Sequence, residues 1–247
     1  MDVSAVVPAH DEDRLLGRGL DAIAVAAERA RLDVEVVVVA NRCTDRTAEI
    51  AAAAGAVVVE SGARCLSAVR NAGIEAAVGR RIVTIDADSR MSPFALVDAT
   101  RLLDAGGIVG GGTLVVPERR SAGITATYAL VGALTAVTRL SGGMFWADRA
   151  DIEAIGGFDE AVLVGEDLDF ARRLRAHGRR DGRRFVALRT APMVASCRKF
   201  DRHGDWHMFA MGRDLPRILR SIRGVDTEWV DEYFHDRVDD PPDQARR

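Results

Sequence analysis

Short apolar runs alternate with helix-like segments from residue 3 to residue 86, and this order constrains the fold more than any other feature. The apolar runs, which are typical of strands buried on both faces, are residues 3–9, 34–40, 56–60 and 81–86. The segments between them, with helical spacing or helix end signals, are residues 13–31, 44–56 and 66–78. Strands that alternate with helices of this length predict an α/β fold with a mainly parallel central sheet flanked by helices.

The pattern becomes less regular after Pro93. We expect helices at residues 94–104, 122–138, 167–177 and 204–222. We expect strands at 106–116, where glycines predict a bend or bulge, and at 142–147, 184–188 and 192–196. No repeat and no linker divides the chain. We therefore expect one domain over residues 1–235, followed by a disordered polar tail over 236–247.

Composition places the chain among soluble globular proteins, with 48% hydrophobic and 29% charged residues. The net charge of −3 gives no electrostatic reason to expect a nucleic-acid partner. Three cysteines, Cys43, Cys65 and Cys197, form neither a disulfide framework nor a metal-binding spacing. No cleavable apolar segment precedes the first strand, so the expected location is the cytoplasm.

Residues 122–138 carry no charge, which sets them apart from the rest of the chain. A membrane-spanning helix needs roughly 20 apolar residues, and this segment is shorter and diluted by Thr and Gly. The pattern favours a helix buried in the fold or at a subunit interface. It leaves open a peripheral contact with a membrane, and oligomerisation.

Polar clusters follow three of the predicted strands, at residues 8–12, 40–45 and 86–89. Ligands of parallel sheets bind at the carboxyl ends of the strands. The alternation of a strand places Asp86 and Asp88 on one side and Ala87 on the other. Two such carboxylates raise each other's pKa unless a cation is present, and Mg²⁺ or Mn²⁺ would also bridge a diphosphate. The alternative is a turn that caps the next helix. The position at a strand end favours the cation site.

Five motifs in this order resemble family-2 glycosyltransferases of the GT-A fold, over about Val3 to Phe200. They are VVPAHDE at 6–12, ANRCTDRT at 40–47, RCLSAVRNAGI at 64–74, DADS at 86–89, and GGFDE at 156–160 followed by GEDLDFARRLRAHG at 165–178. The resemblance implies an enzyme that moves a sugar from a nucleotide-sugar donor to an acceptor hydroxyl. It makes residues 1–105 the nucleotide-binding half and 106–235 the acceptor half.

The resemblance also implies roles for individual residues of the donor site. Pro8, Ala9 and Glu12 would line the base and ribose site, and Asn41 would face the edge of the base. The other expected donor-site residues are Arg64 at the family's basic position, Asp86 beside the ribose or cation, Ala87 next to it in the motif, and Asp88 as the ligand of Mn²⁺ or Mg²⁺.

For catalysis, the resemblance makes Asp167 the general base that takes the proton of the acceptor hydroxyl, with Glu166 orienting the acceptor. This implies a single displacement with inversion of the anomeric configuration. The residues alone allow a simpler interpretation. Glu12 and Asp167 could each be an acidic residue that stabilises the N-terminus of a helix. Arg70 and Asn71 could brace strands rather than contact phosphate.

The chain departs from the family pattern in two places. Asp11 stands where the family has Asn, and Ala40 with Asn41 replaces an acidic pair that commonly reads uracil, so the nucleobase remains open. Related enzymes often take a metal ligand from a C-terminal histidine. His203 is the candidate here, and His207 would share its face if the segment is helical. A surface histidine with no ligand is the alternative.

Other functions remain as alternatives. A nucleotidyltransferase should carry a Gly-rich phosphate loop with a Lys after the first strand, and residues 8–19 contain no such loop. A non-catalytic nucleotide-sugar-binding module does not need both Asp88 and Asp167, which are present. A retaining transferase is a further alternative. The sequence names neither the sugar nor the acceptor.

Overall fold

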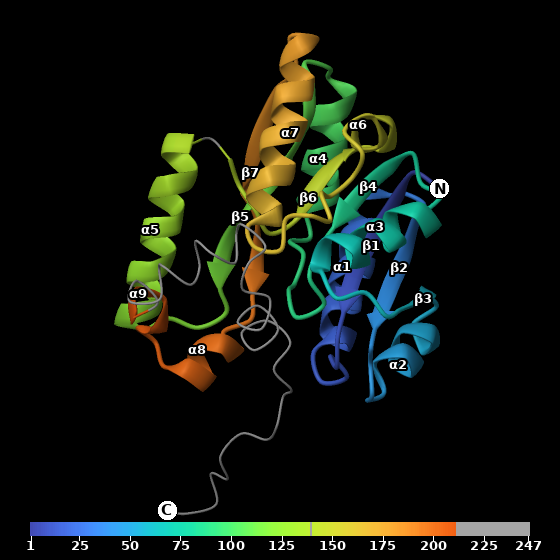
Figure 1. Cartoon of the computed structure of the whole chain (residues 1–247). Helices are drawn as coiled ribbons and strands as arrows, with labels where there is room; N and C mark the ends of the chain where they lie inside the picture. The colour runs from blue at the N-terminus through green and yellow to red at the C-terminus, as the bar shows by residue number, and fades with distance from the viewer. Residues whose placement is uncertain (139, 211–247) are drawn as a thin grey trace, which may run out of the picture.

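A seven-stranded sheet forms the centre of the computed structural model, which describes residues 1–138 and 140–210 (Figure 1). The strands are β1 Val3–Ala9, β2 Val34–Asn41, β3 Val57–Ser61, β4 Arg81–Thr84, β5 Ile108–Pro117, β6 Phe145–Asp148 and β7 Arg184–Ala195. Their order in the sheet is β3-β2-β1-β4-β6-β5-β7. Strand β6 runs antiparallel to both β4 and β5, and the other pairs are parallel. The expected α/β fold with a mainly parallel sheet is confirmed.

Helices cover both faces of this sheet. They are α1 Leu16–Ala30, α2 Thr47–Ala53, α3 Leu66–Ala76, α4 Ala95–Asp104, α5 Ala122–Thr138, α6 Arg149–Ala154, α7 Glu166–Arg180, α8 Arg198–His203 and α9 His207–Ala210. One core cluster packs α1 and α4 against the sheet, and a second packs α3, α6 and α7. Neighbouring strand residues divide between the clusters, Val38 in the first and Val37 in the second, as the strand period of two requires.

The central position of β6 was not expected. Its residue Trp146 is buried in the first core cluster and donates its Nε1–H to Gly112 O at 3.1 Å. Phe145 points into the second cluster, where its ring packs edge-on against Phe158 and Phe170. Both aromatic rings of β6 are therefore core residues, in keeping with their burial at 1% exposure.

Two strand predictions are wrong in detail. The segments 184–188 and 192–196 form the single strand β7, whose register against β5 shifts between Thr113 and Val115. Pro192 lies within the shift and has no N–H to donate to a ladder, which explains why the sequence looked interrupted there. Strand β4 ends at Thr84, two residues before its predicted end.

The prediction that residues 122–138 are helical is confirmed, but their burial within the fold was predicted wrongly. Helix α5 stands apart from the sheet, with α8 and α9 near its first turns (Figure 1). Only its N-terminal part is buried, where Ile124 and Tyr128 pack with Cys197 and Phe200. Apolar residues further along the helix are exposed, for example Leu134 at 55% and Val137 at 84%. Within residues 1–138 and 140–210, no helix is both long and apolar enough to span a membrane.

The helix expected at 204–222 was placed wrongly at its start. The described segment contains two short helices, α8 and α9, because Gly204 at φ 85° ends the first of them. Residues 211–222, the proposed domain end at 235 and the predicted tail at 236–247 lie outside the described residues.

Candidate active site

One cleft of about 300 Å³ collects ten of the eleven site residues predicted from the sequence. Those ten are Pro8, Ala9, Glu12, Asn41, Arg64, Asp86, Ala87, Asp88, Glu166 and Asp167. The carboxyl ends of β1, β2 and β4 supply most of them, and the first turn of α7 supplies the last two. His203, by contrast, is not among the residues that line the cleft.

Asn41 at the end of β2 is buried, and its Oδ1 has no hydrogen-bond partner among the described residues. Its backbone carbonyl accepts a hydrogen bond from His10 Nδ1 at 2.7 Å, which ties the end of β2 to the loop after β1. A buried amide oxygen without a partner is costly, so this atom suits a ligand that donates a hydrogen bond. The amino edge of a nucleobase has such donors.

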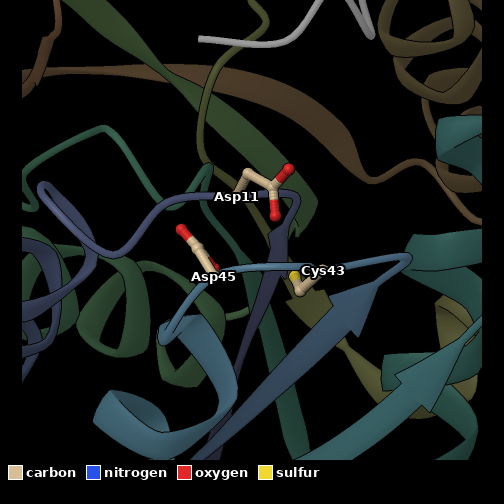
Figure 2. A group of neighbouring side chains, drawn as sticks. All are labelled: Asp11, Cys43 and Asp45. Atoms are coloured by element: carbon tan, nitrogen blue, oxygen red, sulfur yellow. The ribbon is translucent and has the colours of Figure 1, made fainter. Parts of the chain in front are cut away.

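The loops that follow β1 and β2 are fastened together by their own side chains. Figure 2 shows Asp11 in the first loop facing Cys43 and Asp45 in the second. Asp11 Oδ1 accepts the Thr44 N–H at 2.6 Å, and Asp45 Oδ2 accepts the Asp13 N–H at 2.9 Å. These reciprocal bonds keep the loop that carries Glu12 in place beside the cleft.

The same three side chains bring their ligand atoms within 4.8 Å of one another, a spacing that a metal ion can use. Their present bonding argues against that role. Both carboxylates already accept backbone N–H groups, and burial raises the pKa of the Cys43 thiol, which favours its protonated form. We interpret the cluster as a loop fastening.

Asp86 and Asp88 lie in the turn after β4 rather than on the strand, so the alternation argument for their common side does not apply. Each carboxylate has a different arginine beside it. Arg70 Nη2 donates to Asp86 Oδ1 at 3.1 Å, and Arg198 Nε lies 3.4 Å from Asp88 Oδ2. Burial raises the pKa of Asp88, and Arg198 offsets part of that rise. As oxygen donors, the two carboxylates fit Mg²⁺ or Mn²⁺.

Arg70 of α3 links the two ends of the cleft. Its side chain is 2% exposed, and its Nη1 donates to Asp167 Oδ1 at 2.7 Å and to Glu166 Oε1 at 3.2 Å. The guanidinium also lies over the ring of Phe158, with its Cζ 5.0 Å from the ring centroid. The sequence suggested only that Arg70 could brace strands, and its contact with three carboxylates was not predicted. A helical pattern does not show which arginine points into the protein.

The next residue of α3, Asn71, holds the loop between α6 and α7. Its amide donates to Phe158 O at 2.9 Å and accepts the Phe158 N–H at 2.8 Å. It also donates to Glu160 Oε1 at 3.0 Å. Gly157 sits at φ 68°, and a Cβ there would lie 2.6 Å from Asn71 Oδ1, so glycine is required at this position. The loop at 156–160 is thus fixed to the helix that carries Arg70.

Glu166 and Asp167 are the first two residues of α7, where an acidic side chain stabilises the N-terminus of a helix, as the sequence alone allowed for Asp167. The surroundings nevertheless raise both pKa values. Burial is the main cause at each, Asp167 adds to the rise at Glu166, and Arg70 opposes both. The Gly143 N–H also donates to Asp167 and lowers its pKa. A carboxylate with a raised pKa is a better proton acceptor than an ordinary aspartate.

Arg198 at the start of α8 is a cleft residue that the sequence reasoning did not select. It donates to both carboxylate oxygens of Glu12, which is buried. Burial raises the pKa of Glu12 to about 7, and Arg198 opposes that rise. The basic pair Arg198–Lys199 in the C-terminal segment was the available signal. Nothing in the sequence, however, indicates that Arg198 contacts Glu12, which lies 186 residues earlier in the chain.

His203 lies at the end of α8 and is exposed. Its ring centroid is 5.7 Å from that of His207, but the two residues belong to separate helices and do not share a helix face as expected. His207 is buried, and its Nδ1 donates to Gly204 O at 3.0 Å. The proposed metal ligand His203 therefore stays a prediction, outside the cleft.

Residues 1–182 match the family model described as "Glycosyltransferase like family 2". The chain belongs to this family. The match includes the ends of β1, β2 and β4 and the first turn of α7, which are the parts of the chain that build most of the cleft. Among curated protein sequences, no match is found.

Solved structures of glycosyltransferases share the fold of this family-2 chain. TarS 1–349 of S. aureus is 17% identical with a TM-score of 0.63, over 82% of this chain and 63% of that one. The mannosyltransferase PcManGT of Pyrobaculum calidifontis, in complex with GDP-Man and Mn²⁺, is 21% identical with a TM-score of 0.61, over 78% and 56%.

Glucosyl-3-phosphoglycerate synthase of Mycobacterium tuberculosis, in complex with Mn²⁺, UDP and glucosyl-3-phosphoglycerate, is similar over a larger share of its length. It is 21% identical with a TM-score of 0.62, over 91% of this chain and 80% of that one. By contrast, this chain spans less than two thirds of the length of the TarS and mannosyltransferase chains. Together these likenesses show the GT-A fold.

Proposed function

We propose that this chain transfers a sugar from a nucleotide-sugar donor to an acceptor hydroxyl, with a divalent cation and with inversion. The observation that carries the proposal is the arrangement around Arg70. It places the carboxylate of Asp167 and that of Asp86 on one buried guanidinium, within one cleft. Membership of the family supports the same chemistry, as do the nucleotide complexes of proteins with this fold.

The donor lies, in this proposal, across the carboxyl ends of the first strands. Pro8 and Ala9 line the base and ribose site, the amide of Asn41 accepts a hydrogen bond from the base, and Arg64 lies on the exposed side of the cleft. Asp88 would hold Mn²⁺ or Mg²⁺, and Asp86 and Ala87 line the cleft next to it in sequence. When bound, the cation neutralises negative charge on the departing nucleoside diphosphate.

Asp167 accepts the proton of the acceptor hydroxyl in this proposal. The oxygen of that hydroxyl then attacks the anomeric carbon, a new C–O bond forms, and the bond from that carbon to the diphosphate breaks, with its electron pair leaving on the diphosphate. Attack from the face opposite the leaving group inverts the anomeric configuration. Glu166, held by the same Arg70, orients the acceptor.

A thermal-shift panel tests the proposal. The chain is titrated with UDP-, GDP- and dTDP-sugars, each with Mn²⁺ and with EDTA. A ligand that binds only the folded state adds about 2.7 kcal/mol to the free energy of unfolding at a hundredfold excess over Kd, and Tm rises accordingly. We expect one nucleotide class to raise Tm in Mn²⁺ and far less in EDTA. Unchanged Tm for all three classes under both conditions would contradict the proposal.

A further inference from the structure

Arg198 joins two parts of the chain that are far apart in sequence. Its Nη1 donates to Glu12 Oε2 at 2.7 Å, its Nη2 donates to Glu12 Oε1, and its Nε lies 3.4 Å from Asp88 Oδ2. One guanidinium therefore neutralises the carboxylate after β1 and the carboxylate after β4 together. A planar fork of donors is suited to this, whereas a lysine ammonium could not reach both groups in the same way.

The helix that carries Arg198 is anchored on α5 and on the segment that precedes α5. Phe200 of α8 packs with Ile124 and Tyr128 of α5, and Glu118 Oε1 accepts the Cys197 N–H at 2.9 Å. The carboxylates of Glu12 and Asp88, in contrast, belong to the loops at the sheet edge. The ion pair therefore connects α8 and the start of α5 to the donor end of the cleft.

Asp88 cannot be shared freely between Arg198 and a second cation. A divalent ion that takes Asp88 oxygens competes with the guanidinium for the same negative charge and places two cations side by side. A nucleoside diphosphate changes this balance, because its phosphate oxygens are good partners for a guanidinium. Arg198 could then exchange a carboxylate for a phosphate.

We propose that Arg198 is the resident counter-cation of Glu12 and Asp88, that it competes with the divalent cation for Asp88, and that a nucleoside diphosphate relieves this competition. The inference rests on the proposed function. It assigns to Arg198 a positioning role that makes cation and diphosphate bind as a pair. It predicts weak binding of Mn²⁺ alone and much tighter binding once a nucleoside diphosphate is present.

Mn²⁺ binding in the absence of nucleotide is the direct test. Free Mn²⁺ is followed by electron paramagnetic resonance during titration of wild type and Arg198→Gln. Loss of a positive charge a few ångströms from Asp88 should tighten Mn²⁺ binding by about tenfold or more. Arg202→Gln removes the same charge from the exposed side of the same helix and should leave the Kd for Mn²⁺ unchanged. A salt bridge with only a structural role would lower Tm in Arg198→Gln without changing that Kd.

Two further variants locate the effect. Asp88→Asn combined with Arg198→Gln should lose the gain in affinity, because the gain requires the Asp88 carboxylate. Arg198→Lys keeps the positive charge but cannot pair with both carboxylates, so it should bind Mn²⁺ more tightly than wild type and less tightly than Arg198→Gln. It serves if Arg198→Gln fails to fold. Affinity equal to wild type in both Arg198 variants would overturn the inference.

The same titrations, repeated with UDP and with GDP, separate this inference from the proposed function. Wild type could bind Mn²⁺ tightly with either nucleotide while the Arg198 variants, without nucleotide, keep the wild-type Kd for Mn²⁺. That pair of results would overturn the competition alone. No Mn²⁺ binding by wild type with either nucleotide, and none by the Arg198 variants, would overturn both the competition and the cation-dependent transfer.

Discussion

Arg70 Nη1 lies 2.7 Å from Asp167 Oδ1, and Nη2 of the same buried guanidinium lies 3.1 Å from Asp86 Oδ1. One side chain of α3 thereby sets the distance between the proposed proton acceptor and the proposed donor site. The contact also offsets the cost of keeping Glu166 and Asp167 charged where both side chains are partly buried.

Arg70→Gln should destabilise the fold strongly. Removing one partner of a buried ion pair leaves uncompensated charge and typically costs about 3–5 kcal/mol. The free energy of unfolding is measured by urea denaturation at neutral pH. Arg46→Gln breaks an ion pair with Glu49 in which both side chains are more than 70% exposed, and it should cost at most about 1 kcal/mol. Equal costs in the two variants would contradict the central place of Arg70.

The pH dependence of transfer should reflect the raised pKa of Asp167. Burial raises this pKa, and Arg70 with the Gly143 N–H lowers it only in part. The base acts when charged, so kcat/KM should fall as pH drops through that pKa, at a pH above the ordinary value of about 3.9 for aspartate. A pH profile measured from the acidic side checks this. A rate that stays constant down to pH 4 would contradict the assignment.

Asn41→Ala should weaken nucleotide binding without weakening the fold. The substitution removes a buried oxygen that has no partner among the described residues, so Tm without nucleotide should not fall. Loss of one hydrogen bond to the base should raise the Kd for the donor by about three- to tenfold.

Asn71→Ala should show the opposite pattern, because that amide pins the loop at Phe158. We expect its Tm to fall while its donor Kd stays close to wild type. Calorimetry measures the donor Kd and thermal melts measure Tm. The same changes in Kd and Tm in both variants would argue against a base contact at Asn41.

Gly142→Ala should slow transfer while leaving donor affinity intact. A Cβ at Gly142 would lie 3.3 Å from Asp167 Oδ2, so the carboxylate must shift by a few tenths of an ångström. A small misplacement of a proton acceptor should lower kcat by roughly tenfold. Gly132→Ala on α5, where a Cβ meets nothing within 4 Å, is the matched control and should keep its rate. Wild-type kcat in Gly142→Ala would show that Asp167 tolerates displacement.

The sequence predicted the strands and the cleft because both depend on local signals. Apolar runs mark β1, β2 and β4, and polar residues that follow parallel strands must meet at one sheet edge. Asn41 and Asp88 could therefore be placed together before the fold was known. The same reasoning could not place β6, because a short apolar run carries no signal of its neighbours or its direction.

The rest of the site depends on contacts between distant parts of the chain. Arg70 looks like any polar residue of a helix, and only the fold brings the first turn of α7, with Asp167, within reach of its side chain. Arg198 meets Glu12 across 186 residues, through a helix that begins after the irregular strand β7. The exposed apolar face of α5 was missed for a related reason, since an uncharged helix usually is buried.

Asp167 is the proposed proton acceptor, and the transfer kinetics of Asp167→Asn test this role. The variant keeps the size of the side chain but cannot take a proton, so kcat should fall by about 10²–10⁴-fold. Donor affinity should barely change, and the acidic limb of the pH profile should be altered. Asp169→Asn is the control, since Asp169 pairs with Arg173 at 2.6 Å and lies outside the cleft. It should transfer sugar at close to the wild-type rate.

Two results would contradict this role of Asp167. Wild-type transfer by both variants would remove the catalytic assignment of Asp167, and with it most of the case for inversion. Loss of donor binding together with catalysis in Asp167→Asn would instead place the residue in the phosphate or cation site, and Glu166 would become the next candidate for the base. If Asp167 is the base, Asp167→Asn alone should show near-normal donor affinity with a collapsed kcat.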